Sequence, residues 1–398
     1  MTFVHVTGDN DIKIWGLTPR ERIIRQAKQL PGVRLIDDLE QLAPDASVIL
    51  VDSGYVVETR ALQGLLTRPN VVLRCPADGK FAAAHVAAAN TALALSLLDG
   101  SEADTTVPLD VLGPSDLDVF DKSLRRSAAP LLEPVTIERR DWLENVLYGN
   151  AYKGITDLVT KFVWPRPARH VVRWCANAGV SPNAVTITGF LLMILAGALF
   201  ARGHFVLGLL AAWPMTFLDT VDGKLARVRI EASRFGHVLD HGMDLLHPPF
   251  WYLLWGMGLG SFAATFGIDR AGYDWIIFAG YVVGRLCEAR FHSYGKCGIF
   301  GWRPFDSYFR LIAARRNPCL ILLTASILVG RPDIGFVAVA TWTAASTAVL
   351  AVRLAYARSV YAEDGPLRSW LAEPATAARD HPRAFQVFAV TRAAYPLG

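Results

Sequence analysis

The sequence predicts two structural parts in one chain, an α/β domain at the N-terminus and then an all-α domain of six transmembrane helices. Hydrophobic residues make up 52% of the 398 residues and are concentrated after about Pro182, where the chain is too apolar for a soluble domain. The first hundred residues instead alternate short apolar strands with amphipathic helices. The net charge of +4 is too small and too dispersed to indicate a nucleic-acid partner.

The N-terminal elements follow from apolar periodicity and from local end signals. Thr18 suits an N-cap, and Pro19 suits the first position of the helix that follows. The alternation of strands and helices along the chain predicts a mostly parallel sheet covered by helices. The expected strands lie at 2–6, 48–51 and 71–73, and the expected helices at 18–30, 59–66 and 81–98. Residues 100–132 are polar and acidic and are expected to form a connector or a peripheral extension.

An aromatic and basic segment, residues 137–173, precedes the apolar part. Aromatic side chains mixed with basic ones are typical of a helix that lies at the headgroup level of a membrane. A solvated linker helix is the alternative interpretation. Within this segment Lys153, Asp157 and Lys161 recur at fourfold spacing, so they would line one helical face.

Six hydrophobic segments follow and are expected to cross a lipid bilayer. They lie at about 183–201, 205–229, 236–258, 273–291, 317–330 and 334–357, and the fifth is the shortest. Basic residues gather in the loops at one set of helix ends, which places those ends in the cytoplasm. Both termini should therefore be cytoplasmic, with the chain in the cytoplasmic (inner) membrane. The N-terminus has no basic and apolar leader that would direct secretion.

Four carboxylates interrupt the apolar sequence between residues 218 and 244. Asp219 and Asp222 are three residues apart, and Asp240 and Asp244 are four apart, so on helices each pair shares a face. Ionisable groups are costly in such a segment and indicate a function. Carboxylate oxygens suit hard divalent cations, so one or two ions of Mg²⁺ or Mn²⁺ are expected here.

The neighbouring residues extend this candidate site toward a phosphate-bearing ligand. Gly223 and Ala226 leave the helix surface bare, and Arg227 can hold a phosphate oxygen. Together with the acids they suggest a nucleotide diphosphate held through metal. His237 and His241 form an HxxxH pattern that would allow zinc, but the four carboxylates favour a harder ion.

The spacing of these residues resembles the signature of the CDP-alcohol phosphotransferase family. All eight positions match, in the order Asp219, Asp222, Gly223, Ala226, Arg227, Gly236, Asp240 and Asp244. The resemblance implies a membrane enzyme that cleaves a CDP-alcohol and passes the phospho-alcohol moiety to a second alcohol, releasing CMP. Two alternatives are a polar seam between transmembrane helices and a catalytically idle receptor or scaffold that binds a nucleotide or CDP-lipid. The intact acidic set favours catalysis.

The same resemblance implies roles for individual residues. The four aspartates would ligate metal, and Asp244 would also take the proton of the acceptor hydroxyl. Nucleotide contacts are implied for Gly223, Ala226, Arg227 and Gly236, and, in the entry to the first membrane helix, for Asn183 and Thr186. A surplus of basic residues near the cytoplasmic mouth predicts an acceptor that carries negative charge, although lipid anchoring would also explain them. These residues are Lys153, Arg285, Arg290, Arg315 and Arg316.

The first hundred residues resemble the sugar-phosphate nucleotidyltransferases, which are Rossmann-like. Residues 16–22 look like the segment that opens their second helix, and 48–53 like their central strand. Their glycine-rich nucleotide loop is missing, because only residues 6–10 stand in its place and cannot wrap a triphosphate. Asp52 matches a metal-binding aspartate of that family, although a lone aspartate after a strand more often forms a turn. We expect a cytidylyltransferase-like domain that has lost catalysis.

These expectations divide the chain into four parts. They are the cytidylyltransferase-like domain (1–135), a linker with a juxtamembrane amphipathic helix (136–180), the six-helix CDP-alcohol phosphotransferase domain (181–358) and a cytoplasmic tail (359–398). A fused N-terminal domain resembles di-myo-inositol-phosphate phosphate synthase-like proteins and favours a soluble, CDP-inositol-like donor. CDP-diacylglycerol with a polar alcohol, or a CDP-headgroup with a lipid acceptor, are the alternatives. A homodimer is expected.

Overall fold

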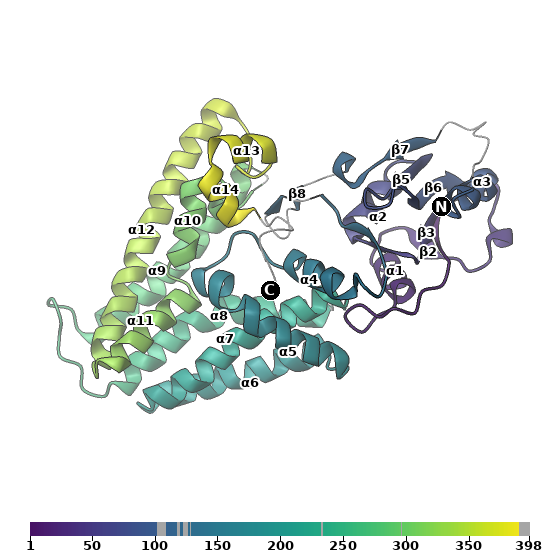
Figure 1. The fold of residues 1–398 in the computed structure, drawn as a ribbon. Coiled ribbons are helices and arrows are strands. Elements are labelled where there is room, and N and C mark those ends of the chain that lie inside the picture. Colours follow the sequence, from purple (N-terminus) through teal and green to yellow (C-terminus); the bar gives the residue numbers. More distant parts are fainter. Residues whose placement is uncertain are drawn as a thin grey trace.

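The computed structural model describes residues 1–101, 109–117, 120–121, 126–127, 129–231, 234–295 and 297–389. Figure 1 shows an α/β part beside a larger helical part, and α4 (Arg140–Asn150) and α5 (Pro165–Asn177) lie between the sheet and the long apolar helices. The predicted combination of an α/β N-terminal part and a helical C-terminal part is confirmed.

A six-stranded sheet forms the centre of the N-terminal part, in the order β2-β1-β3-β6-β5-β7. Its strands are β1 (Thr2–Thr7), β2 (Val33–Leu35), β3 (Ser47–Asp52), β5 (Val71–Arg74), β6 (Phe81–Ala87) and β7 (Asp110–Leu112). Helices α1 (Pro19–Ala27) and α2 (Thr59–Leu66) cover one face, and α3 (Thr91–Leu98) packs on the other. Thr18 caps α1 and accepts a hydrogen bond from the Glu21 backbone nitrogen, as its sequence predicts.

One expectation for this part is wrong. Residues 81–98 do not form one helix, because residues 81–87 are strand β6 and the helix begins only at Thr91. The predicted mostly parallel sheet is confirmed, because five of its six strands run in one direction and β6 alone pairs antiparallel, with both β3 and β5. Ala82, Ala83 and Ala84 are fully buried, and their small side chains let helices lie close on both faces of the sheet. Tertiary pairing overrides the helix propensity of alanine here.

The expected connector also contributes to the fold. Strand β7, from residues 110–112, pairs parallel with β5 and forms one edge of the sheet. Further short strands pair in twos, β4 (Tyr55–Val57) with β10 (Leu132–Pro134) and β8 (Phe120–Asp121) with β9 (Arg126–Ser127). Beyond β10 the chain enters α4, a π-helical turn η4 (Val159–Val163), and α5.

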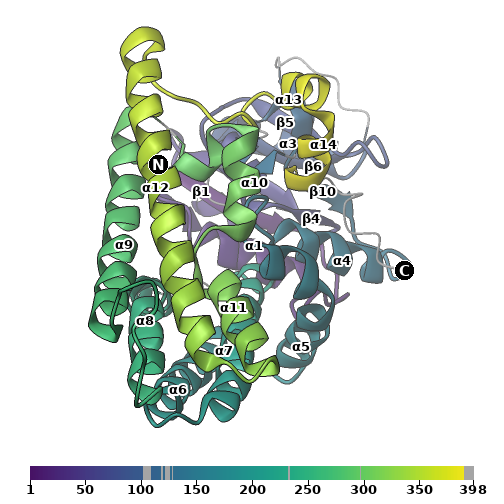
Figure 2. The same ribbon diagram turned by 90° about the vertical axis from the view of Figure 1, so that its left-hand side faces the viewer.

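The apolar segments form helices whose ends lie within a few residues of those expected, except that the last helix continues seven residues further. They are α6 (Pro182–Ala201), α7 (Phe205–Val228), α8 (Arg234–Gly258), α9 (Arg270–Phe291), α11 (Arg316–Leu328) and α12 (Pro332–Asp364). Helix α6 packs along α7 and α8, and α12 packs along α9 and α11. Figure 2 shows the long helix α12 beside α9 and α11. A short helix, α10 (Pro304–Ile312), precedes α11.

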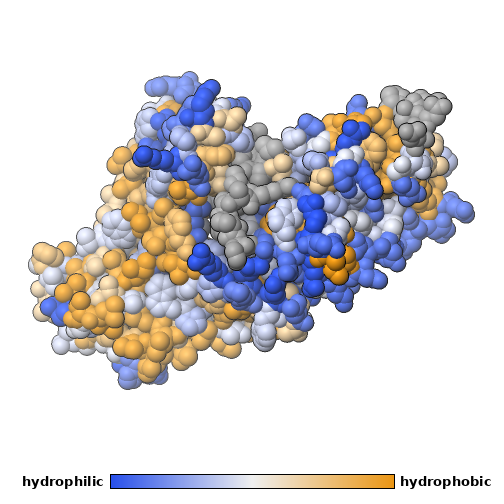
Figure 3. Space-filling model, in the orientation of Figure 1, coloured by the Kyte–Doolittle hydropathy of each residue, from blue (hydrophilic) through white to orange (hydrophobic). Residues whose placement is uncertain are grey.

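Many large apolar side chains of this helical part face outward. Leu191, Leu210 and Trp275 are each more than 60% exposed, which is unusual for a soluble surface. Figure 3 shows apolar residues gathered over the helical part. Within the described residues, α6, α7 and α12 are long and apolar enough to cross a membrane. The bent pair α10 and α11 adds a fourth span if the two helices are counted together.

The described part of the tail packs on the helical part. Helices α13 (Pro374–Asp380) and α14 (Pro382–Phe388) join a buried cluster with Phe291 of α9 and Phe309 of α10. Leu367 forms a bridge with Gly295. The described residues of the tail are therefore part of the packed helical domain.

Candidate active site

Asp222 occupies a buried position near the cytoplasmic end predicted for α7. Its side chain is 5% exposed, and the hydroxyl of Thr186 on α6 donates to its Oδ2 over 2.6 Å. Ser181 caps α6 by accepting from the Ala184 backbone nitrogen, which sets Thr186 in the second turn of that helix. An unpartnered carboxylate would be costly at this depth, so the threonine supports the predicted metal ligand directly.

Asp219 and Asp244 come together although α7 and α8 carry them separately. Arg316, the first residue of α11, donates to Asp219 Oδ2 over 2.5 Å and to Asp244 Oδ1 over 2.8 Å. The guanidinium is largely buried, with 13% of the side chain exposed, whereas Asp244 is about half exposed. Arg316 was predicted to bind the acceptor, and the structure places it between two predicted metal ligands.

The donor set suits a hard cation. Two carboxylates from different helices converge on one positive group, and Asp222 lies one turn from Asp219 on the same helix. Oxygen donors of this kind fit Mg²⁺ or Mn²⁺ better than softer metals. The side chains of Asp240, His237 and His241 lie outside the described residues. Among the residues that are described, no group of three or more His, Cys, Asp or Glu side chains is arranged as a metal centre.

The predicted nucleotide residues lie near the start of α6, in the last turns of α7 and in the first turn of α8. The Arg227 side chain folds back along Gly223, and a Cβ added to Gly223 would lie 3.4 Å from Arg227 Nη1. Arg227 also donates a hydrogen bond to the Ala151 carbonyl over 3.2 Å. Ala226 is half-buried beside it, and Gly236 lies in the first turn of α8. Asn183 lies one turn before Thr186 on α6. The bare surface that Gly223 offers is therefore partly covered by Arg227 in this structure.

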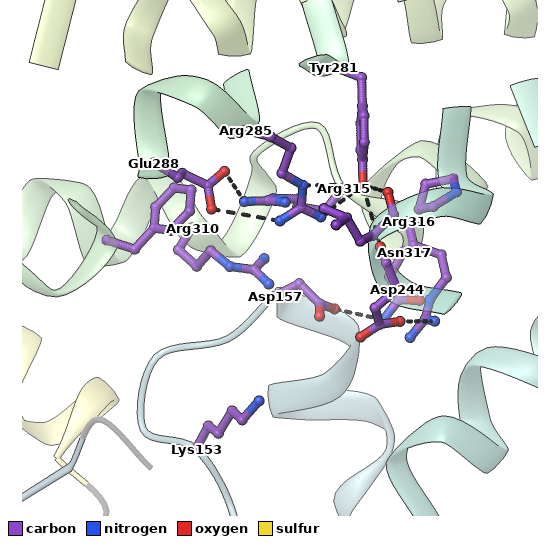
Figure 4. Close-up of a pocket in the computed structure, with 13 residues that line it drawn as sticks. Lys153, Asp157, Asp244, Tyr281, Arg285, Glu288, Arg310, Arg315, Arg316 and Asn317 are labelled. Atoms are coloured by element: carbon purple, nitrogen blue, oxygen red, sulfur yellow. Dashed lines mark hydrogen bonds and ion pairs between the residues drawn. The ribbon is translucent and has the colours of Figure 1, made fainter. Parts of the chain in front are cut away.

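A cavity of about 340 Å³ opens beside Asp244 and Arg316. Figure 4 shows its charged lining, which comes from the segment before η4 and from α8, α9, α10 and α11. Five lining residues are basic and three are acidic, which leaves a surplus of two positive charges. The basic ones are Lys153, Arg285, Arg310, Arg315 and Arg316, and the acidic ones are Asp157, Asp244 and Glu288.

Internal partners hold the arginines of this cavity in place. Glu288 forms an ion pair with Arg315 and another with Arg285, the latter at 3.7 Å. Arg285 also donates to the Tyr281 hydroxyl over 2.9 Å. Asn317 donates to Asp157 Oδ1 over 2.9 Å, which joins α11 to the segment that precedes η4. A prearranged basic wall with partial neutralisation suits a small anion.

Four of the five predicted acceptor residues line this cavity, but Arg290 does not. Arg290 is exposed one turn further along α9, where it donates to Ser293 Oγ and stacks against Tyr294. Sequence reasoning missed Arg310 as a member of the site. It lies on α10, whose nine residues fall between two predicted membrane segments, and only its place in a run of basic residues could have drawn attention to it.

The fourfold pattern of Lys153, Asp157 and Lys161 is broken by the backbone. Lys153 and Asp157 line the cavity, whereas the Lys161 ammonium donates to the Gly154 carbonyl over 2.8 Å and is buried. Burial lowers the pKa of Lys161 to about 8. The segment is not an α-helix here, since an irregular stretch leads into a π-helical turn, so fourfold spacing does not place the three residues on one face.

The N-terminal domain shows how its two notable residues are used. Asp52, at the end of β3, accepts a hydrogen bond from the Gly54 backbone nitrogen over 2.7 Å, which is the geometry of a turn-forming aspartate. Burial raises the pKa of its carboxyl group. Gly8 has φ +69°, and an added Cβ would lie 3.0 Å from Asp52 Oδ1. Glycine is therefore required at this close approach.

Comparison with known proteins identifies the helical part. The sequence model for CDP-alcohol phosphatidyltransferases matches residues 179–287, which include α6 to α8 and all four aspartates. The inner membrane protein YnjF of Escherichia coli is 31% identical over 149 residues, which cover 71% of that protein and 31% of this chain. The chain belongs to the CDP-alcohol phosphatidyltransferase family.

Other relatives within this family have more specific names. Archaetidylinositol phosphate synthase of Pyrococcus horikoshii is 35% identical over 96 residues, covering 24% of this chain and 50% of that protein. The bifunctional IPC transferase and DIPP synthase of Rubrobacter xylanophilus is 29% identical over 195 residues, covering 49% and 42%. The chain thus spans half or less of the length of these two relatives.

Family membership agrees with the outward-facing apolar helices. A CDP-alcohol phosphatidyltransferase domain with several membrane-competent helices, related to an inner membrane protein, indicates a multi-pass membrane protein. Enzymes of this family generally depend on a divalent metal ion.

Proposed function

We propose that this protein is an integral-membrane CDP-alcohol phosphotransferase. It transfers a substituted phosphate from a CDP-alcohol to an acceptor alcohol and releases CMP, in phospholipid or inositol-phosphate-type biosynthesis. One observation carries the proposal: carboxylates from α7 and α8 converge beside a basic cavity of about 340 Å³. A structural polar seam needs neither the cavity nor its surplus of positive charge.

In this proposal Asp219, Asp222, Asp240 and Asp244 hold divalent metal, with two ions of Mg²⁺ or Mn²⁺. When bound, the metal neutralises the charge of the donor's pyrophosphate and of the departing CMP. Thr186 fixes the orientation of Asp222 through its 2.6 Å hydrogen bond. Arg316 neutralises Asp219 and Asp244 in this structure, so it must give way when those carboxylates ligate another cation.

The donor nucleotide is assigned to the cytoplasmic ends of α6, α7 and α8. Gly223, Ala226 and Gly236 let it approach the backbone, and Arg227 holds a phosphate oxygen, for which it must leave its contact with the Ala151 carbonyl. Asn183 is assigned to the nucleotide on the resemblance alone. The structure offers Thr186 a partner in Asp222, so we assign it to positioning that carboxylate as well.

Asp244 serves as the base for the acceptor hydroxyl. Its carboxylate is about half exposed and lines the cavity, so a hydroxyl bound there can reach it. The hydroxyl oxygen forms a new bond to the donor phosphorus, the bond from that phosphorus to the CMP oxygen breaks, and the hydroxyl proton passes to Asp244. CMP leaves as the second product.

The acceptor is proposed to carry its own negative charge. Lys153, Arg285, Arg310, Arg315 and Arg316 line the cavity and outnumber its acids. Glu288 and Asp157 neutralise part of this positive charge, and a phosphate or other anionic group on the acceptor would neutralise more of it. An inositol phosphate has this chemistry, and names of relatives that include archaetidylinositol phosphate synthase favour it. The donor is then CDP-diacylglycerol or a CDP-inositol-like compound.

The membrane arrangement is part of the proposal. We assign six spans to α6, α7, α8, α9, α11 and α12, with both termini and the carboxylates on the cytoplasmic side of an inner membrane. Residues 1–135 are a degenerate cytidylyltransferase-like domain, 136–180 a linker and juxtamembrane helix, 181–358 the catalytic domain and 359–398 the tail. Lipid surrounds the catalytic domain, and the protein acts as a homodimer.

Product analysis tests the reaction. Purified full-length protein is offered a panel of CDP-alcohols with soluble and lipid acceptors, and the products are identified by mass spectrometry. Asp219→Asn should abolish CMP release, because a neutral amide does not replace a metal-ligating charge. Asp333→Asn is the matched control, because Asp333 lies at the start of α12 and pairs with Arg331. Wild-type turnover by Asp219→Asn would contradict the metal-ligating role of Asp219. Nucleotide binding by the wild type without any product would favour an idle receptor.

A pair of variants on α9 tests the charged acceptor. Arg285→Ala removes a cavity arginine and should raise the acceptor's KM about tenfold, since a hydrogen bond to an ion is worth about 1.5–3 kcal/mol. Arg290→Ala removes an exposed arginine of the same helix that lies outside the cavity, and it should leave both KM values unchanged. Equal effects of the two variants would assign these arginines to lipid headgroups.

A further inference from the structure

The N-terminal domain contacts the helix that carries Asp219 and Asp222. Three side chains of the α1 region reach the last backbone carbonyls of α7 and the turn after it. Arg22 Nη1 donates to Val228 O over 2.7 Å, and Arg25 Nη1 donates to Arg229 O over 3.0 Å. Gln29 Nε2 donates to Ile230 O over 3.3 Å.

The first two contacts satisfy carbonyls that a helix leaves unsatisfied, those of Val228 and of the C-cap residue Arg229. The last four carbonyls of an α-helix have no partner within the helix and lie at its negative end, where cations stabilise them. Arg22 is 5% exposed, and burial beside Arg25 lowers its pKa to about 10, so it still carries its charge at neutral pH. Val228 is the last residue of α7, and Ile230 has φ +54°, so the chain turns sharply where the contacts are made.

Two ion pairs with Glu231 hold the same turn. Arg25 Nη1 lies 2.6 Å from Glu231 Oε1, and Arg229 Nη2 lies 3.0 Å from the same oxygen. Arg229 also donates to the Ala176 carbonyl of α5 over 3.3 Å. The end of α7 is therefore held between α1 of the N-terminal domain and the end of α5.

A second contact fixes the N-terminal domain against the helical part. The Trp15 backbone nitrogen donates to Glu144 Oε1 over 2.9 Å, and its indole Nε1 donates to the Glu144 carbonyl over 3.0 Å. Trp15 is 1% exposed, and an added Cβ on Gly16 would lie 3.1 Å from the Ala176 carbonyl oxygen. The loop between β1 and α1 is thus buried against α4 and α5.

We propose that the N-terminal domain is a positioning element for the active site, in which Arg22 and Arg25 hold the end of α7 and so set where α7 presents Asp219 and Asp222. This inference rests on the proposed function. Val228 lies six residues beyond Asp222, about 9 Å along the helix at 1.5 Å per residue. A stiff helix passes a displacement of its end over that distance to the carboxylates, and small misplacements of reacting groups cost large factors in rate.

Full-length variants purified in detergent test the proposal. Arg22→Ala removes the buried guanidinium, and Arg22→Lys keeps a cation that can reach the same carbonyl. Arg34→Ala is the matched control, because Arg34 is an exposed arginine on β2 of the same domain. Amide hydrogen exchange is measured over residues 223–231, Mn²⁺ affinity by titration with the metal alone, and kcat and KM where transfer occurs.

We expect Arg22→Ala to speed exchange at residues 226–231 at least tenfold, to weaken Mn²⁺ binding at least tenfold and to lower kcat at least tenfold. Arg22→Lys should recover part of each loss, and Arg34→Ala should match wild type. Arg25→Ala, Glu231→Ala and their double variant form a cycle. If Arg25 acts through Glu231, the double variant loses no more Mn²⁺ affinity or kcat than the more affected single variant.

The outcomes separate this inference from the proposed function. Unchanged exchange in Arg22→Ala, or faster exchange with unchanged Mn²⁺ affinity and kcat, overturns the positioning role. If the wild type transfers nothing but Arg22→Ala still weakens Mn²⁺ binding, positioning stands and the phosphotransferase proposal falls. A uniform loss of folded protein in all variants, with normal Mn²⁺ affinity in what remains, also overturns the inference, because the contact would then serve stability alone.

Discussion

The hydrogen bond between Thr186 and Asp222 gives the sharpest test of the site. Thr186→Val removes the hydroxyl that donates to Asp222 Oδ2 over 2.6 Å and keeps the shape of the side chain. Both residues are 5% exposed, so water does not readily replace the hydroxyl. A hydrogen bond to a charged group is worth about 1.5–3 kcal/mol, which corresponds to about 10- to 150-fold in rate. We expect kcat/KM to fall by a factor in this range.

The same helix supplies a matched control. Thr188 is exposed two residues further along α6, and its hydroxyl donates to the Ala184 carbonyl of its own helix over 2.9 Å. Thr188→Val should therefore leave CMP release at the wild-type level. The assay measures CMP release by purified full-length protein with the donor and acceptor found by mass spectrometry. Wild-type kcat/KM in Thr186→Val, or the same loss in both variants, would refute the supporting role.

The kinetic pattern also distinguishes the two roles considered for Thr186. If the hydroxyl orients Asp222, kcat falls and the donor's KM changes little. If it contacts the nucleotide equally in ground and transition states, the donor's KM rises while kcat stays the same.

Three further predictions concern metal, pH and the N-terminal domain. Chelation with EDTA should stop CMP release and Mg²⁺ or Mn²⁺ should restore it, because the donor set is all carboxylate, whereas rescue by zinc alone would contradict the hard-ion assignment. Burial lowers the pKa of Lys161 from 10.5 to about 8, so between pH 8 and pH 10.5 the unfolded chain binds more protons than the folded protein. Raising the pH through this range therefore favours the folded state, and the Tm of the wild type should rise relative to that of Lys161→Met as the pH increases from 8 to 10. A constant Tm difference would show that Lys161 does not titrate in this window. The full-length protein should release no pyrophosphate from CTP and a phospho-alcohol, because the loop carrying Trp15 is packed against Glu144 of α4, and detectable pyrophosphate would show that the N-terminal domain is active.

Local sequence signals predicted the helical part well. Continuous apolar runs bounded by Gly, Pro and charged residues defined α6 to α9 and α11, whose ends lie within about three residues of those expected. Thr18 and Pro19 marked the start of α1 because capping depends on adjacent residues alone. The eight-residue signature likewise needed no tertiary information, since its spacing on two helices puts the acids on shared faces.

Strand β6 and the lining of the basic cavity could not be predicted in this way. Residues 81–87 are alanine-rich and favour a helix locally, but pairing with β3 and β5 makes them a strand. Arg285 and Arg290 are indistinguishable as basic residues near the same helix end, yet Arg285 lines the cavity and Arg290 does not. Arg310 lines the cavity from α10, which lies at 41° to α11, and no local sequence pattern encodes that angle.

The sequence by itself thus determined which apolar segments of the helical part form helices and which of them carry the acids, because capping, periodicity and apolar length are properties of neighbouring residues. Only the tertiary structure decided that Arg316 lies between Asp219 and Asp244, that Thr186 supports Asp222, and that α1 holds the end of α7. The contact between α1 and α7 joins residues more than 200 positions apart. Such pairings depend on how the helices pack against one another, and packing is a property of the whole chain that periodicity does not contain.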